Sequence, residues 1–153
     1  MKHKFVSLGV ALIILLAMVL SNLGVVTANA ATNIALGKTA NCSSVEGIIY
    51  PCSYAVDGNM NTRWASILSP TGPEWIYVDL YGIFDITQIV FEWENAYATT
   101  YEIQVSTDAS SWATIYSTST GSGYREVLNV TGKGRYIRMY GTEHNVSFWG
   151  YSI

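Results

Sequence analysis

The sequence is poor in charge and in several residue types on which site chemistry depends. Of its 153 residues, 12% are charged, and there are eight basic side chains, two histidines, two cysteines and three prolines. The positive charges are scattered, so the chain lacks the basic stripe that a phosphate backbone requires. We therefore do not expect nucleic acid as a partner, and the length predicts a single domain.

Cysteine is too scarce for a thiolate metal site, because Cys42 and Cys52 have no histidine pair nearby to complete four zinc ligands. A disulfide between them would close a loop of nine residues in an oxidising compartment. The alternative is a pair of small buried thiols. The sequence leaves both alternatives open.

Signatures of common catalytic sites are absent as well. There is no G-x-S-x-G elbow, H-E-x-x-H, phosphate-binding loop or C-x-x-C, and His144 is the only histidine after residue 30. Glu46, Glu92 and Glu94 could include the acid and nucleophile of a glycosidase, but a domain of this size offers little depth for the cleft. We therefore expect no enzymatic activity, although the chain could be a fragment or an accessory module of a glycoside hydrolase.

The N-terminal region has the pattern of a secretory signal peptide. Basic residues precede an uncharged run over residues 5–20, and Ala28, Asn29 and Ala30 form a small-residue cleavage triplet. This predicts removal of residues 1–30 and a secreted, extracellular domain over residues 31–153, the alternative being an uncleaved anchor. The domain has six basic and eleven acidic side chains, a formal net charge of −5. It has no run approaching the roughly 20 apolar residues of a membrane span, so we do not expect a membrane partner.

The composition of the domain is typical of an all-β protein. Tyr, Trp, Val, Ile and Thr are common, and turn residues recur about every 8 to 12 positions. The alternation is clearest over Tyr101–Ser106, where Tyr101, Ile103 and Val105 should face inward and Glu102 and Gln104 should face water. The pattern predicts six strands: Glu74–Leu80, Ile86–Glu94, Thr100–Ser106, Trp112–Tyr116, Tyr124–Val130 and Arg135–Tyr140.

The connections between these strands are short and predict a β-sandwich. Ile86–Glu94 is more continuously apolar than the others, which suits a central strand covered on both sides or by loops. Thr107–Ser111 is expected to be a turn, because Asp108 can accept hydrogen bonds from the backbone that follows it. Four tryptophans lie in or beside the strand patterns and are expected in the core: Trp64, Trp75, Trp93 and Trp112.

Residues 33–73 form a long irregular segment, and loops of such length are usually functional in small domains. Ser53–Gly58 has the pattern of a single helical turn. The six residues that follow, 59–64, concentrate oxygen-bearing side chains and carbonyls that could surround a calcium ion.

Eight motifs, which cover nearly the whole domain, resemble one known family. The chain resembles the discoidin, or coagulation factor V/VIII type C, domain in the branch called carbohydrate-binding module family 32. It is most similar to modules attached to chitosanases and β-1,3-glucanases. The resemblance implies a jelly-roll β-sandwich of the galactose-binding-domain-like type, with a sugar site in the loops at one end. The motifs are 33–38, 43–47, 55–58, 62–66, 74–80, 93–97, 101–106 and 135–141.

The same resemblance implies the site residues. Glu46, Arg63 and Glu94 would be polar contacts, Tyr151 the aromatic platform, and Trp149 a neighbouring exposed aromatic together with Phe148. Carboxylates and guanidinium groups can bond sugar hydroxyls, and a carboxylate can pair with the ammonium of glucosamine. An aromatic face can cover the apolar side of a pyranose. A structural alternative is that Arg63 pairs with Asp57 or Asp79.

Two departures from the family pattern affect these expectations. Leu68 stands where related modules often present an aromatic or acidic contact. The chain stops at Ile153, so the jelly roll is expected to lack its last C-terminal strand, which normally supplies a glutamate to a calcium site. The resemblance implies structural calcium bound by Asp57, Asn59 and Thr62. Loss of the last strand would leave such a site without its glutamate ligand.

The sequence thus predicts a secreted, non-catalytic, monomeric module that binds a polysaccharide, either chitosan or a β-1,3-glucan. One alternative is terminal-galactose binding through His144 and Arg63. Another is cell-surface or lipid adhesion by apolar residues of the loops, with residues 67–68 and 148–149 as candidates. A glycoside hydrolase is the third.

Overall fold

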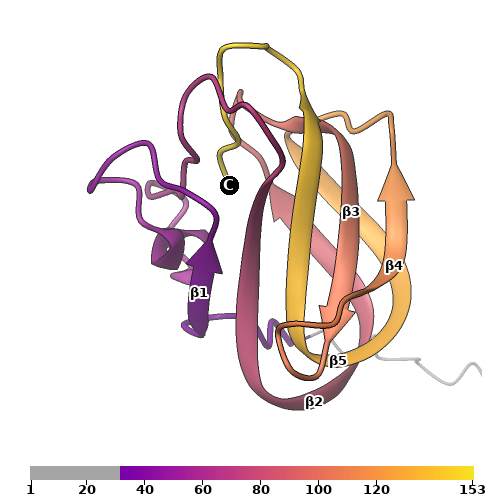
Figure 1. The fold of residues 1–153 in the computed structure, drawn as a ribbon. Helices are drawn as coiled ribbons and strands as arrows, with labels where there is room; N and C mark the ends of the chain where they lie inside the picture. The colour runs from indigo at the N-terminus through magenta and orange to yellow at the C-terminus, as the bar shows by residue number, and fades with distance from the viewer. Residues whose placement is uncertain (1–31) are drawn as a thin grey trace, which may run out of the picture. The chain divides into compact units, whose positions relative to one another are not determined.

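The described part of the chain consists almost entirely of β-strands. The computed structural model describes residues 32–153, and the predicted signal peptide lies outside them. Within the described residues no helix is long and apolar enough to cross a membrane. The elements are β1 (Thr39–Cys42), the 3₁₀ turn η1 (Cys52–Val56), β2 (Glu74–Glu92), β3 (Ala98–Ser106), β4 (Ala113–Thr118) and β5 (Arg125–His144), shown in Figure 1.

Strands β2 and β5 are 19 and 20 residues long, and each covers most of two strands expected from the sequence, except that β2 ends at Glu92 and β5 begins at Arg125. The chain bends where separate strands were predicted. In β2 the pairing register shifts between Asp79 and Phe84, and Tyr81 there has a left-handed φ of 65°. In β5, Gly134 permits close packing, because a Cβ there would lie 2.9 Å from the Ser106 carbonyl oxygen.

The strands pair antiparallel in the order β1-β2-β5-β3-β4. The first half of β2 pairs with the second half of β5, and the second half of β2 with the first half of β5. Figure 1 shows both long strands curving round at one end, so that their other halves form a layer behind β1, β3 and β4. This confirms the all-β sandwich class. Strand β1 was missed, because four residues are too few to show alternation.

The core lies between the two layers. Tyr101, Ile103 and Val105 are buried in it as predicted, together with Trp64 and Trp93. The prediction was wrong for Trp75 and Trp112, which are half-buried and belong to neither core cluster. Trp75 alternates with the core residue Ile76 in β2, so its ring stands on the outer side of the sheet. The Trp112 ring, from the turn before β4, lies near the Tyr77 ring of β2.

The expectation that Ile86–Glu94 is covered on both sides was also wrong. Ile86 and Phe91 point into the core, but Gln88 is exposed and Val90 is 41% exposed. The back layer therefore has a solvent face, and its run of apolar residues does not reflect burial on two sides.

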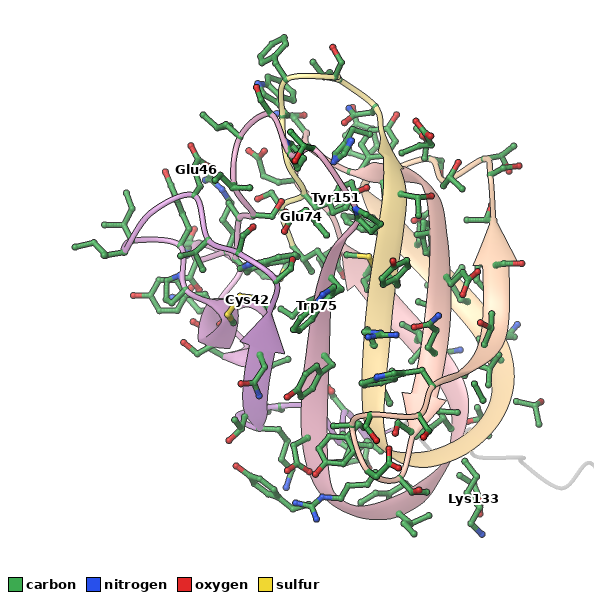
Figure 2. The ribbon with its side chains drawn as sticks, in the orientation of Figure 1. Cys42, Glu46, Glu74, Trp75, Lys133 and Tyr151 are labelled. Carbon is green, nitrogen blue, oxygen red and sulfur yellow. A yellow bond between two sulfur atoms is a disulfide. The ribbon has the colours of Figure 1, made fainter. Side chains whose placement is uncertain are left out.

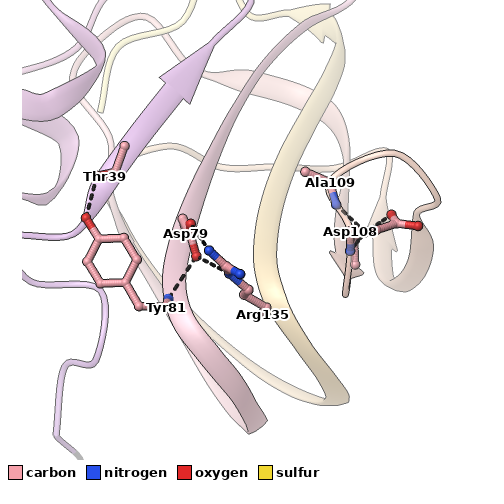
Figure 3. Close-up of polar contacts among 7 residues, drawn as sticks. Thr39, Asp79, Tyr81, Asp108, Ala109 and Arg135 are labelled. Atoms are coloured by element: carbon pink, nitrogen blue, oxygen red, sulfur yellow. Dashed lines mark hydrogen bonds and ion pairs between the residues drawn. The ribbon is translucent and has the colours of Figure 1, made fainter.

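The end of the molecule where β2 bends is fixed by charged and polar contacts (Figure 3). Arg135 donates two hydrogen bonds of 2.8 Å to the two carboxylate oxygens of Asp79. Asp79 also accepts a hydrogen bond from the Tyr81 backbone N–H. The turn between β3 and β4 forms as predicted, because Asp108 accepts hydrogen bonds of 2.8 Å from the N–H groups of Ser110 and Ser111.

Cys42 at the end of β1 and Cys52 at the start of η1 are joined by a disulfide (Figure 2). This is one of the two alternatives that the sequence left open. The bond closes the loop that carries Glu46, and it ties that loop to the strand edge beside the core.

Candidate functional site

A cleft of about 270 Å³ lies among the loops at one end of the sandwich. Its lining includes all five residues predicted for the sugar site: Glu46, Arg63, Glu94, Trp149 and Tyr151. These residues come from four separate segments of the chain. Figure 2 shows Glu46 and Tyr151 near the end of the fold where the loops gather.

The floor of the cleft is built by backbone hydrogen bonds between three segments. The Trp64 N–H donates to the Ile153 carbonyl at 2.9 Å, and the Ser66 N–H donates to the Tyr151 carbonyl at 2.9 Å. The Glu94 N–H donates to the Ser152 carbonyl at 3.0 Å. Residues 151–153 thus lie between the Trp64–Ser66 and 94–96 segments and hold Arg63 and Glu94 on the same cleft.

Glu46 is positioned by a loop with several anchors. Its N–H donates to the Ala65 carbonyl at 2.8 Å. The Ser44 hydroxyl accepts from the Ile67 N–H at 2.9 Å and donates to the buried Glu74 carboxylate at 2.5 Å. The Glu46 side chain itself is exposed, so its carboxylate is open to a ligand.

Arg63 stacks on an aromatic ring instead of forming an ion pair. Its guanidinium carbon lies 4.3 Å from the centroid of the Tyr50 ring, and its Nε is buried without a hydrogen-bond partner among residues 32–153. The structural alternative of a pair with Asp57 or Asp79 is wrong, because Asp79 is held by Arg135 and Asp57 bonds within its own loop. The guanidinium is thus available to the cleft.

Glu94 follows the end of β2 and remains exposed. One of its carboxylate oxygens accepts a hydrogen bond of 2.8 Å from the Asn95 N–H, which fixes the side chain close to the backbone. Glu92, the other candidate acid on this strand, instead pairs with Arg125 and does not line the cleft.

Tyr151 does not present an aromatic platform, which corrects the prediction. The residue is 1% exposed, and its ring stacks on His144 with centroids 4.4 Å apart. Burial also raises the pKa of its hydroxyl. Tyr151 lines the cleft, but its ring forms part of the buried wall.

The accessible aromatic side chain of the cleft is Trp149, which is half-buried. The Phe148 ring packs edge-on against it at 5.5 Å and is 58% exposed. The Phe148 carbonyl accepts from the Ser69 N–H at 3.0 Å, so this loop lies beside Leu68, a lining residue that is 50% exposed. Leu68 and Trp149 therefore give the cleft an apolar border.

His144 does not line the cleft. Its Nε2 is buried without a partner among the described residues, and burial lowers the pKa of the imidazole. The galactose alternative needs His144 and Arg63 to contact one sugar, and the cleft brings only Arg63 to that position.

The predicted calcium ligands converge in the loop after η1. Asp57 accepts hydrogen bonds from the Asn59 N–H at 2.8 Å and the Thr62 hydroxyl at 2.7 Å. Within the described residues no group of three or more His, Cys, Asp or Glu side chains is placed to hold a metal. Calcium usually takes six to eight oxygen ligands, which here would have to include amide, hydroxyl and backbone oxygens. Calcium binding stays a prediction.

The sequence did not single out several polar residues of the lining, namely Ser66, Asn95 and Ser152. Ser66 has a structural role, because its hydroxyl accepts from the Tyr151 N–H at 2.8 Å. A Cβ on Gly150 would lie 2.2 Å from the Ser66 hydroxyl oxygen, so only glycine fits beside this contact. Ser66 belongs to the motif 62–66 and Asn95 to the motif 93–97, and these motifs were the available signals.

A known protein family matches most of the described chain. The model of the F5/8 type C domain matches residues 39–152. The chain belongs to the F5/8 type C domain family. Among solved structures of F5/8 type C relatives, chitosan-binding module 1 of a chitosanase/glucanase from Paenibacillus sp. IK-5 is similar, with 40% identity and a TM-score of 0.75. The alignment covers 80% of this chain and 94% of that module.

Two further structures extend this comparison of the F5/8 type C domain. Chitosan-binding module 2 of the same Paenibacillus enzyme, in complex with chitotriose, is 40% identical with a TM-score of 0.73, covering 78% of this chain and 94% of the module. The family 32 module of Clostridium perfringens NanJ, in complex with galactose, has a TM-score of 0.65 at 20% identity, covering 76% and 94%. The similarity to the NanJ module, at 20% identity, concerns the fold alone.

A curated relative is the polysaccharide lyase 8 family protein HylA of Enterococcus faecalis, 36% identical over 69 residues. This match covers 45% of the F5/8 type C chain and 5% of HylA, so the chain spans a small part of that relative.

Proposed function

We propose that the protein is a non-catalytic carbohydrate-binding module that binds a polysaccharide through the cleft at the loop end of the sandwich. The observation that carries the proposal is the convergence of Glu46, Arg63, Glu94 and Trp149 on one cleft. The polar groups can bond hydroxyls in fixed directions, and the indole can cover the apolar side of a pyranose.

We propose chitosan as the polysaccharide. Two exposed carboxylates can each accept a charge-assisted hydrogen bond from a glucosamine ammonium. The net charge of −5 after residue 30 favours a cationic polymer over an anionic one. Relatives at 40% identity are described as chitosan-binding modules, which supports the same choice. A β-1,3-glucan is the alternative, because Arg63 and Trp149 suit a neutral sugar.

Binding at one cleft is expected to be weak. An open surface site buries little of a sugar and must displace ordered water, so most of the contact energy offsets the cost of association. Retention would then depend on repeated units of a polymer. The leader-like residues 1–30 support export, and we propose that the module acts outside the cell, where such polymers occur.

Affinity electrophoresis tests the proposal. The protein is run in native gels containing chitosan, laminarin or galactan, and reducing-sugar release is measured in parallel. Retardation by chitosan without release of product supports a binding module. Release of product would identify an enzyme, retardation by galactan alone would favour the galactose alternative, and no retardation in any gel would contradict saccharide binding. Sedimentation with liposomes tests the lipid alternative.

A further inference from the structure

A second group of aromatic side chains stands on the outer side of the front layer, and none of them lines the cleft. We call this group the outer aromatic face. It arises from strand alternation, since Ile76 and Met139 enter the core and their neighbours point the other way. Figure 2 shows Trp75 beside the first half of β2. The face consists of Trp75 and Tyr77 from β2, Tyr136, Arg138 and Tyr140 from β5, and Trp112 from the turn before β4.

The rings form a continuous surface across the strands. The Trp75 and Tyr77 rings are stacked at 5.6 Å with an angle of 13° between their planes, and the Tyr77 ring lies 5.6 Å from that of Trp112. The Arg138 guanidinium carbon lies 4.0 Å from the Trp112 ring centroid and 5.1 Å from that of Tyr140. Such contacts fix the rings before a ligand arrives, which lowers the entropy lost on binding.

The polar atoms of these rings differ from those of the core aromatics in their hydrogen-bond partners. In the core, the Trp64 indole donates to the Ser44 carbonyl at 3.0 Å, and Trp93 and Tyr101 both donate to Glu126. On the outer face, the indole N–H groups and the tyrosine hydroxyls have no protein partner among residues 32–153. None of them is a buried unpaired atom. Five hydrogen-bonding groups are therefore open to solvent beside the ring surfaces.

A fixed polar network borders the rings. Glu102 accepts hydrogen bonds of 2.7 Å from the Gln104 amide and the Thr114 hydroxyl, and Gln104 accepts one of 2.7 Å from Arg138 Nε. Gln104 was predicted to face water. That prediction was wrong, because the network covers the side chain and leaves it 9% exposed. Because Glu102 accompanies Arg138, the local charge is nearly balanced.

We propose that the outer aromatic face is a second saccharide-binding surface that takes an extended stretch of the same neutral or cationic polysaccharide. The inference rests on the proposed function. A pyranose chain presents apolar C–H groups to the rings and hydroxyls to the five open donors. A lipid or an apolar protein surface would leave those donors and the Glu102 network without partners, which is costly. An anionic polymer would meet Glu102 and an acidic domain.

Two surfaces on one domain change how the protein responds to chain length. A polymer long enough to reach both surfaces binds the second one at a high effective concentration. Long chains would then be retained more strongly than short oligosaccharides by a factor that neither surface alone provides.

The test uses the indole N–H signals of the wild-type protein in NMR titrations with chitohexaose and with laminarihexaose. Movement of the Trp75 and Trp112 signals supports the inference. Movement of Trp149 alone would overturn it and leave the cleft as the site. Movement of the outer signals without Trp149 would support it while contradicting the proposed function. If no indole moves, both fail for these sugars.

Variants provide an independent check in gels containing chitosan or laminarin. We expect Tyr77→Ala with Trp112→Ala to weaken retention of the protein by about fivefold or more. The matched control is Tyr124→Asn, which removes a 73% exposed ring at a left-handed position that asparagine tolerates. Unchanged retention of the double variant would overturn the inference. So would sedimentation showing that the wild type is a dimer and the double variant a monomer, since the face would then be a self-association surface.

Discussion

The guanidinium carbon of Arg63 lies 4.3 Å from the centre of the Tyr50 ring, with its Nε buried and unpaired within the described residues. Arg63 lines the cleft, and its guanidinium has no acidic partner among residues 32–153. A planar, always charged group held in this way can bond two neighbouring hydroxyls of one sugar.

Replacing Arg63 by lysine is expected to weaken sugar binding with little effect on stability. Lysine keeps the charge but loses the planar donors and the stacking on Tyr50. We expect sugar affinity to fall about tenfold, while the free energy of unfolding changes by less than about 1 kcal/mol. Calorimetric titration with chitosan oligomers and thermal unfolding measure the two effects. Arg125→Lys, outside the cleft, is the control, and an Arg63→Lys variant with full affinity would contradict the assignment.

Substitutions of Tyr151 and Trp149 are predicted to differ in their effect on sugar binding. The Tyr151 hydroxyl is buried with no partner among residues 32–153, so Tyr151→Phe should leave the free energy of unfolding unchanged or raise it by up to about 1 kcal/mol, with sugar affinity unaltered. Trp149→Ala should weaken sugar binding with little effect on stability. Chemical denaturation and sugar titration of both variants test this. Loss of affinity in Tyr151→Phe would show that its hydroxyl contacts the ligand.

The disulfide should support both stability and binding. Replacing Cys42 and Cys52 by serine frees the loop that carries Glu46 and is expected to cost about 2–4 kcal/mol of unfolding free energy. Sugar affinity should fall as well, because Glu46 then has to be ordered on binding. Urea unfolding and sugar titration measure the two losses. Equal stability of the variant and the parent would contradict this role for the disulfide.

The ion pair at the opposite end predicts a specific loss of stability in acid. The two hydrogen bonds from Arg135 lower the pKa of Asp79 below its ordinary value. Because the folded pKa is depressed, the stabilisation is complete above the unfolded value of about 3.9 and is lost as the pH falls through the folded value. Asp79→Asn should therefore be less stable than the parent at neutral pH, and the difference should vanish in stronger acid.

Urea unfolding over a series of pH values measures that difference. Asp85→Asn is the matched control, because Asp85 is 79% exposed and its contact with Lys133 is 3.5 Å long. A constant gap between parent and Asp79→Asn at all pH values would show that the pair does not titrate as described.

The sequence predicted the fold class and the turn at Asp108 because both depend on local patterns. It did not reveal that β2 and β5 run on through their bends, since a bend in a long strand and a turn between two strands use the same residues. Strand alternation could have placed Trp75 on the outer side, because Ile76 follows it, but tryptophan's high average burial favoured the core.

The sequence predicted which polar residues line the candidate site, but not how its aromatic residues pack. Family motifs indicated Glu46, Arg63 and Glu94, and the structure brings all three to one cleft. The burial of Tyr151 could not be predicted, because it depends on the fit of its ring against Trp93, which is distant in the sequence, and against His144 at the end of β5. Packing of that kind becomes visible only in three dimensions.

The most direct test of the central claim is retention of Glu46→Gln combined with Glu94→Gln in native gels containing chitosan. Both carboxylates are exposed, so the double variant should fold normally, and Glu143→Gln provides a matched exposed control. The account predicts that the wild type and the control are retarded by chitosan, and that the double variant loses at least about tenfold in apparent affinity. Retention of the double variant equal to that of the wild type would contradict the account.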